Sequence, residues 1–163
     1  MYRVAIITSS DSGYEGKRED KSGPTIASIV KEHGYEVVSL IVLPDERDML
    51  STEMKKIADE DLADIILTTG GTGFSPRDVM PEATMDIVDR VVPGIPEAMR
   101  AFSLQITKRA MLSRAAAGIR KKTLIVNMPG SPKAVTECLE YIITEFDHAM
   151  GILNGTANNC ARK

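Results

Sequence analysis

A short apolar run that ends in a glycine-rich turn constrains this chain more than any other stretch. Residues 63–84 read ADIILTTGGTGFSPRDVMPEAT, and the apolar residues 65–67 suit a strand that is buried on both faces of a parallel sheet. Ligands of open α/β sheets bind beyond the carboxyl ends of such strands. We therefore expect a binding loop at residues 70–73, where glycines let the backbone approach a ligand closely.

The glycine loop matches neither standard nucleotide motif. A P-loop requires lysine and then Ser or Thr after its last glycine, and a dinucleotide fingerprint requires Gly or Ala where Pro76 stands. An ordinary tight turn explains the glycines alone equally well. The adjacent Arg77 and Asp78, just before a predicted helix start at Pro81, could hold a phosphate and a cation at one spot. A solvated ion pair is the commoner fate of such neighbours.

The rest of the chain alternates between strand and helix patterns. Continuous apolar runs predict strands at 3–9, 36–43 and 123–128, and helical spacing predicts helices at 22–33, 48–62, 81–89, 97–107 and 131–146. Lys121 and Lys122 suit the turn of a hairpin that ends in the last strand. This alternation predicts an α/β fold: a three-layer sandwich with a mostly parallel sheet, helices on both faces and a small antiparallel hairpin.

Length and composition predict one domain over residues 1–163, with a polar, partly mobile tail at 151–163. No window has the length of a membrane span and no signal-peptide core precedes the first strand, so we expect a cytoplasmic protein without a membrane partner. The net charge of −3 argues against nucleic-acid binding. Cys138 and Cys160 are predicted to be free thiols, and His33 and His148 give little support to a histidine-based triad.

Four loops follow the carboxyl ends of the predicted strands, and the fold would gather them at one edge of the sheet. Two predicted helix starts, at Ser22 beside Lys21 and at Ser131, would add backbone N–H groups that favour an anion. A plain capped helix is the alternative at both places. The four loops lie at residues 10–11, 44–45, 70–78 and 130–131.

The sequence of these loops resembles a known family. The segments TTGGTGF, RDVMPEAT, PGIPEAMR, LSRAAAGIR and LIVNMPGSPKAV together resemble the molybdenum-cofactor biosynthesis domain, which occurs in molybdopterin adenylyltransferases and as the amino-terminal domain of gephyrin. The resemblance covers nearly the whole chain. It implies an α/β sandwich that assembles as a homotrimer, binds molybdopterin and activates it with ATP and Mg²⁺, releasing pyrophosphate. A downstream molybdenum-insertion protein would be a further partner.

The resemblance also implies roles for individual residues. Asp45 and Asp78 match the essential aspartates of the family and would be catalytic residues that hold Mg²⁺. The residues implied to bind substrate fall into three groups: the glycine loop (Gly70, Gly71, Thr72 and Gly73), the positions that hold the pterin and its phosphate (Ser113, Arg114, Gly130 and Ser131), and two recurrent positions (Asp11 and Lys21).

One position departs from the family pattern. Met80 stands where the family usually has threonine, and if that threonine caps a helix, its loss costs roughly 0.5–2 kcal/mol and loosens the loop. Two alternatives to the transferase stay open: a scaffold that binds molybdopterin without turnover, and a nucleotide hydrolase on the same fold, which needs no pterin.

Overall fold

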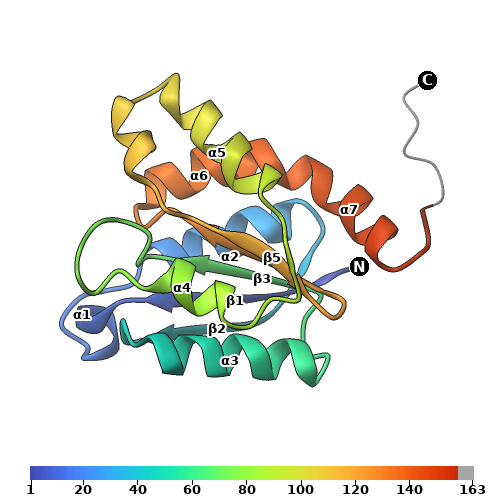
Figure 1. The fold of residues 1–163 in the computed structure, drawn as a ribbon, viewed down its shortest axis with the longest axis horizontal. Coiled ribbons are helices and arrows are strands. Elements are labelled where there is room, and N and C mark those ends of the chain that lie inside the picture. Colours follow the sequence, from blue (N-terminus) through green and yellow to red (C-terminus); the bar gives the residue numbers. More distant parts are fainter. Residues whose placement is uncertain (158–163) are drawn as a thin grey trace.

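A six-stranded sheet runs through the middle of the molecule (Figure 1). In the computed structural model, which describes residues 1–157, the strands lie in the order β2-β1-β3-β6-β5-β4. The pairs β2-β1, β1-β3 and β3-β6 are parallel, whereas β5 is antiparallel to both β6 and β4. The strands are β1 (Arg3–Ser9), β2 (Glu36–Leu43), β3 (Ile65–Thr69), β4 (Arg90–Val91), β5 (Ala117–Arg120) and β6 (Thr123–Met128).

Helices cover both faces of this sheet, as the sequence predicts. Side chains of α3 and α4 pack on one face, and side chains of α2, α5, α6 and α7 pack on the other. Figure 1 shows α3 and α6 on opposite sides of the sheet. The helices are α1 (Asp11–Tyr14), α2 (Ser22–Glu32), α3 (Arg47–Asp59), α4 (Met80–Met85), α5 (Gly94–Leu104), α6 (Pro132–Ile142) and α7 (Phe146–Leu153), with 3₁₀ turns η1 (Lys108–Leu112) and η2 (Ile143–Glu145).

Buried strands divide their side chains between two cores. In β3, Ile65 and Leu67 belong to the core under α2 and α6, and Ile66 belongs to the core under α3 and α4. All five residues of β3 are buried, which explains why its sequence is continuously apolar rather than alternating. The central strands therefore form a rigid platform, and the loops at their carboxyl ends are positioned by it.

Several predicted boundaries need correction. α4 ends at Met85 rather than at residue 89, α5 begins at Gly94, and the edge strand β4 was not predicted, because two residues are too few to show an alternating pattern. Residues 151–153, which were predicted to belong to the tail, lie in α7, where the carbonyl of the buried Gly151 accepts hydrogen bonds from the N–H groups of Thr156 and Ala157. Cys160 and the rest of 158–163 lie outside the described residues.

No helix within residues 1–157 combines the length and the apolar character that a membrane crossing requires.

Candidate functional site

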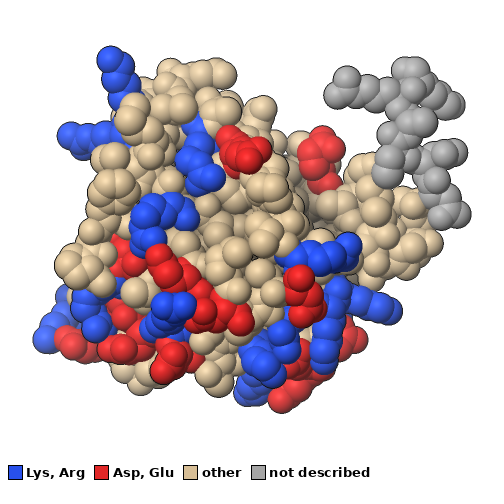
Figure 2. Space-filling model, in the orientation of Figure 1, with Lys and Arg blue, Asp and Glu red and all other residues tan. Residues whose placement is uncertain are grey.

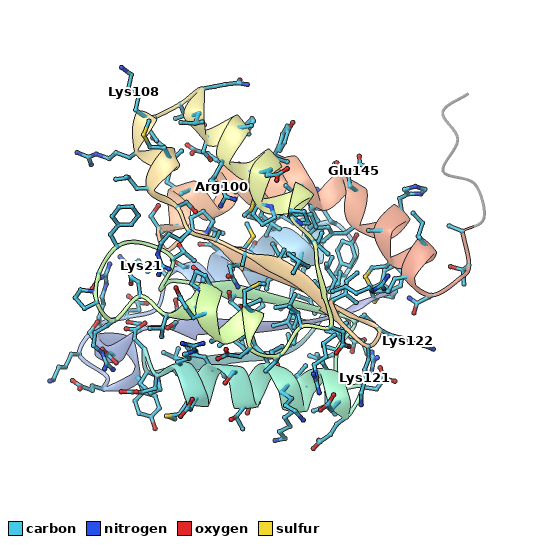
Figure 3. All side chains as sticks on the ribbon, in the orientation of Figure 1. Lys21, Arg100, Lys108, Lys121, Lys122 and Glu145 are labelled. Carbon is cyan, nitrogen blue, oxygen red and sulfur yellow. The ribbon has the colours of Figure 1, made fainter. Side chains whose placement is uncertain are left out.

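The four loops converge on one edge of the sheet, as predicted. The parallel register pairs Ser9 of β1 with Leu43 of β2, and Thr69 of β3 with Met128 of β6, so these strands end side by side. Figure 1 shows α1 and the long loop before α4 at this edge, opposite the hairpin turn between β5 and β6. Figure 3 shows Lys21 at the same edge, far from Lys121 and Lys122.

A cavity of about 680 Å³ opens where three of these loops meet. Ligand pockets for small molecules commonly have this size. The cationic side chains in its wall come from Arg18 and Lys21, and the acidic ones from Glu19 and Asp20. The other lining residues are Thr8, Ser9, Ser10, Gly13, Ser22, Thr69, Gly70, Gly130, Ser131 and Pro132.

Gly70 and Gly130 bring the backbones of two loops together in this cavity. Gly70 has φ +87°, and a Cβ atom placed on it would lie 2.4 Å from the carbonyl oxygen of Ser9. A Cβ atom on Gly130 would lie 3.6 Å from the Cα atom of Gly70. Thr69 Oγ1 holds the two loops at this distance by donating to the carbonyl of Pro129 at 2.6 Å. A side chain at Gly70 is therefore excluded by conformation and by space.

The glycine loop also borders a second cavity of about 300 Å³. Thr72 and Gly73 line it, together with Ser113 and residues of α5, η1 and α6, among them Met99, Arg100 and Ser103. Gly70 and Gly130 line the first cavity and Thr72 and Pro129 line the second, so the same two loops separate them. The structure thus places the predicted pterin-binding residues in different cavities. Gly130 and Ser131 line the first cavity, whereas Ser113 lines the second.

Arg114 holds the glycine loop in place through hydrogen bonds to its backbone. Its Nε donates to the carbonyl of Gly73 and its Nη2 to the carbonyl of Asp78, both at 2.7 Å, and its Nη1 donates to the Glu82 carboxylate. The backbone N–H of Arg114 adds a hydrogen bond to the carbonyl of Thr72 at 2.9 Å. These contacts fix both ends of the segment between Gly73 and Asp78, so Arg114 has a structural task whatever it contacts in a complex.

Asp45 and Asp11 are in direct contact at the carboxyl ends of β2 and β1. The N–H of Asp11 donates to Asp45 Oδ2, and the N–H of Asp45 donates to Asp11 Oδ1, both at 2.9 Å. Ser9 Oγ donates to Asp45 Oδ1 at 2.5 Å. Because Ser9 lines the first cavity, these bonds fix the Asp45 carboxylate close to its wall.

Arg77 and Asp78, expected to act at one spot, turn in different directions. Arg77 Nε and Nη2 donate to the two oxygens of Asp11 at 2.7 and 2.9 Å, and Nη2 also donates to Glu46 Oε1 at 2.8 Å. The guanidinium holds the pKa of Asp11 below its usual value, mainly by these hydrogen bonds. Asp78 Oδ2 instead accepts the N–H of Ser75 at 3.0 Å. The two neighbours form no ion pair with each other among the described residues.

The start of α2 depends on a residue that sequence reasoning missed. Asp20 Oδ1 accepts the N–H groups of Ser22 and Gly23, both at 3.1 Å, and its Oδ2 accepts Thr8 Oγ1 at 2.8 Å. These are the N–H groups that we expected to bind an anion beside Lys21. The Asp-x-Ser-Gly-Pro spacing was the available signal, because an aspartate just before a helix commonly caps it. Lys21 itself stays exposed and lines the cavity.

The start of α6 follows the prediction more closely. Ser131 caps this helix, its Oγ accepting the N–H of Ala134 at 3.2 Å. Ser22 Oγ donates to the carbonyl of Gly130 at 2.7 Å and so connects the start of α2 to the loop after β6. The starts of α2 and α6 therefore meet in one cavity, although Asp20 accepts the N–H groups of Ser22 and Gly23 at the start of α2.

The prediction for Met80 was wrong. Met80 is the first residue of α4 and not its cap, and its side chain is fully buried against α3 and the sheet. Its N–H donates to the carbonyl of Gly71 at 3.1 Å and so ties the start of α4 to the glycine loop. The methionine anchors the loop in the core.

The donors at this edge suit a hard cation such as Mg²⁺. They are carboxylate and hydroxyl oxygens, and Mg²⁺ typically takes one or two carboxylates together with substrate phosphates and water. Asp78 Oδ1 accepts no hydrogen bond among residues 1–157, and each Asp45 oxygen keeps a lone pair beside its single partner. No three His, Cys, Asp or Glu side chains within residues 1–157 cluster as a preformed metal site.

Cys138 is a free thiol, as predicted, and it lines the second cavity. Burial raises the pKa of its thiol, and Ser103 Oγ lies 3.2 Å from its sulfur. A neutral, buried thiol of this kind behaves as a small apolar side chain.

Comparisons with known proteins agree with this architecture. A family model described as a probable molybdopterin binding domain matches residues 5–148. A molybdopterin adenylyltransferase of Helicobacter pylori is 38% identical over 159 residues, covering 93% of this chain and 88% of the relative. The molybdenum cofactor synthesis protein cinnamon of Drosophila melanogaster is 39% identical over 150 residues, covering 91% of this chain and 25% of that longer protein. The crystal structure of the molybdopterin biosynthesis enzyme MoaB from Thermus thermophilus superposes with a TM-score of 0.90 at 43% identity, covering 95% of this chain and 98% of that one.

Proposed function

The chain belongs to the family of probable molybdopterin binding domains, and we propose that it is a molybdopterin adenylyltransferase of molybdenum cofactor biosynthesis. Its reaction transfers AMP from ATP to the terminal phosphate of molybdopterin. The observation that carries the proposal is the cavity of about 680 Å³ where three of the four loops meet, with the Asp45 carboxylate hydrogen-bonded to Ser9 in its wall.

The two cavities suit the two substrates. The first has Arg18 and Lys21 in its wall and the close backbones of Gly70 and Gly130, so it accommodates the phosphates. The second is mainly apolar and includes the hydroxyls of Ser103 and Ser113, so it accommodates a flat pterin ring. Because only the glycine loop and residues 129–130 separate the cavities, the reacting phosphates meet at Gly70.

The chemistry requires positioning more than a reactive side chain. An oxygen of the molybdopterin phosphate attacks the α-phosphorus of ATP, a new P–O bond forms, and the bond to the β-phosphate oxygen breaks to release pyrophosphate. No protein nucleophile takes part. Lys21 and Arg18 offset phosphate charge, and the glycine loop lets its backbone lie close to the phosphates. Mg²⁺, held by Asp45, Asp78 or both, would neutralise charge that develops on the phosphate oxygens.

The proposal includes a homotrimer and a cytoplasmic protein that passes its product to a molybdenum-insertion protein. Exposed apolar side chains on α5, on η1 and in the segment between them support self-association, because such patches commonly mark contact surfaces. Leu104, Ile106, Met111 and Leu112 are each at least 44% exposed. Figure 2 shows charged side chains spread over the lower part of one face and fewer over its upper part.

Replacing Asp78 by Asn tests the proposal. Asn retains an oxygen for the Ser75 N–H but removes the charge, so adenylylation should fall on the order of 100-fold or more. Binding of molybdopterin, measured by fluorescence titration, should stay close to the wild-type value. Asp86→Asn is the matched control, since Asp86 pairs with Arg47 on the outside of α3 and lines neither cavity. Normal turnover by the Asp78 variant would refute its assigned role, and pterin binding by an inactive wild-type chain would favour a scaffold.

A further inference from the structure

Arg77 joins three neighbouring strand ends. It lies in the loop after β3, yet its guanidinium reaches Asp11 after β1 and Glu46 after β2. Because the sheet order is β2-β1-β3, this one side chain crosses the ends of adjacent strands, which lie about 4.8 Å apart. We propose that Arg77 is a positioning residue, which fixes the Asp45 carboxylate through Asp11 and does not bind the substrate phosphates. The inference rests on the proposed role of Asp45.

The hydrogen bonds form a continuous chain from Arg77 to Asp45. Arg77 takes both oxygens of Asp11 in a bidentate pair, and Asp11 Oδ1 also accepts the N–H of Asp45 at 2.9 Å. The Asp11 N–H then holds Asp45 Oδ2 at the same distance. The contact at Asp11 Oδ1 requires one orientation of the Asp11 side chain, and the planar fork of Arg77 supplies that restraint.

Charge gives a second reason for an arginine at this place. Asp11, Asp45 and Glu46 gather three carboxylates at adjacent strand ends, and like charges at short range repel each other. Arg77 is the cation that contacts two of them. Without it, Asp11 would turn toward solvent and the N–H of Asp45 would lose its acceptor, so the backbone that carries the Asp45 carboxylate would be held less firmly.

A phosphate ligand and a positioning fork respond differently to lysine. Lysine binds phosphate well as a point charge, but it cannot donate two parallel hydrogen bonds to Asp11 and a third to Glu46. Arg77→Lys and Arg77→Gln should therefore behave alike. Each should lower kcat about 10- to 100-fold, the effect of a small misplacement, and leave the KM for ATP within about twofold.

Arg47 offers a matched control. Its side chain has the same 51% exposure as that of Arg77, and it makes the same kind of bidentate pair, with Asp86 at 2.7 and 2.6 Å. Arg47→Lys and Arg47→Gln should leave kcat and KM unchanged. Melting curves of all four variants would show that the fold is retained, since exposed ion pairs contribute little to stability.

Hydrogen–deuterium exchange of the ligand-free protein tests the structural step without any turnover. In both Arg77 variants, peptides covering residues 9–12 and 44–46 should exchange faster than in the wild type, whereas both Arg47 variants should match the wild type there. Unchanged exchange at 44–46 would overturn the inference. So would wild-type kcat in Arg77→Lys, or a raised KM for ATP with unchanged kcat, each of which indicates a phosphate ligand. If the wild type itself fails to adenylylate molybdopterin, the proposed function fails, and the exchange result still decides what Arg77 does.

Discussion

Gly70→Ala should destabilise the protein by two separable effects. The first is conformational: alanine at φ +87° costs about 1–2 kcal/mol. The second is steric: the added methyl group would lie 2.4 Å from the Ser9 carbonyl oxygen, and moving backbone in a packed region costs about 1–3 kcal/mol more. The sum is about 2–5 kcal/mol, which for a chain of this size lowers the melting temperature by roughly 5–15 °C.

Comparison with Gly34→Ala isolates the steric contribution to the destabilisation by Gly70→Ala. Gly34 has φ +85°, nearly the value at Gly70, but nothing lies within 4 Å of a Cβ atom placed on it. Both variants lose the same unfolded-chain entropy, so that effect cancels in the comparison. Thermal and urea unfolding, followed by circular dichroism at one protein concentration, should show Gly70→Ala less stable than Gly34→Ala by about 1–3 kcal/mol. Equal stability of the two variants would refute the close approach of the loops after β1 and β3.

Two further variants test the core and the charged surface. Met80→Ala removes a fully buried side chain and should cost about 2–5 kcal/mol in urea unfolding; a cost below 1 kcal/mol would mean that Met80 does not anchor the loop. Asp59 is held ionised chiefly by Arg120, which keeps its pKa well below the usual range. Its contribution to stability is therefore present at neutral pH and is lost as the pH falls below about 4. The melting temperature of Asp59→Asn should lie below that of the wild type at pH 7 and approach it in acid, and a gap that widens in acid would contradict this assignment.

The fold could be predicted because its determinants are local and periodic. The four parallel strands have continuous apolar runs, and α2, α3 and α6 have helical spacing. The end of α2 before Gly34 and the start of α6 after Ser131 were predicted, whereas α3 ends at Asp59 and not at Leu62, and α6 ends at Ile142 and not at residue 146. The hairpin turn at Lys121 and Lys122 was also correct. By contrast, the segment between α4 and β4 depends on tertiary contacts. The N–H of Asp89, just before β4, donates to the carbonyl of Ile119 in β5, a partner 30 residues away.

The position of the candidate site could be predicted from the sheet topology, but the contacts between its side chains could not. Strand direction alone placed Asp11, Asp45, Gly70 and Gly130 at one edge. Sequence neighbours were a poor guide to side-chain partners, because Arg77 pairs with residues 66 and 31 positions away and not with Asp78. Which of several acidic side chains pairs with an arginine depends on the three-dimensional structure and not on distance along the sequence.

Burial explains the error at Met80. In the sequence, the position before Pro81 looks like a helix cap, where a methionine lacks the required oxygen. In the structure, the helix begins one residue earlier, and the position points into the core beneath the glycine loop. When a helix begins one residue earlier than predicted, the residue expected to be its polar cap becomes its first helical residue, which can face the core. Errors of one residue are common at helix ends.

Pyrophosphate release from ATP and Mg²⁺, with and without molybdopterin, tests the central claim most directly. The account predicts release that requires the pterin and proceeds to one pyrophosphate for each molybdopterin adenylylated. Release from ATP alone would identify a nucleotide hydrolase. Tight molybdopterin binding without release would identify a binding scaffold, and either result would contradict the adenylyltransferase.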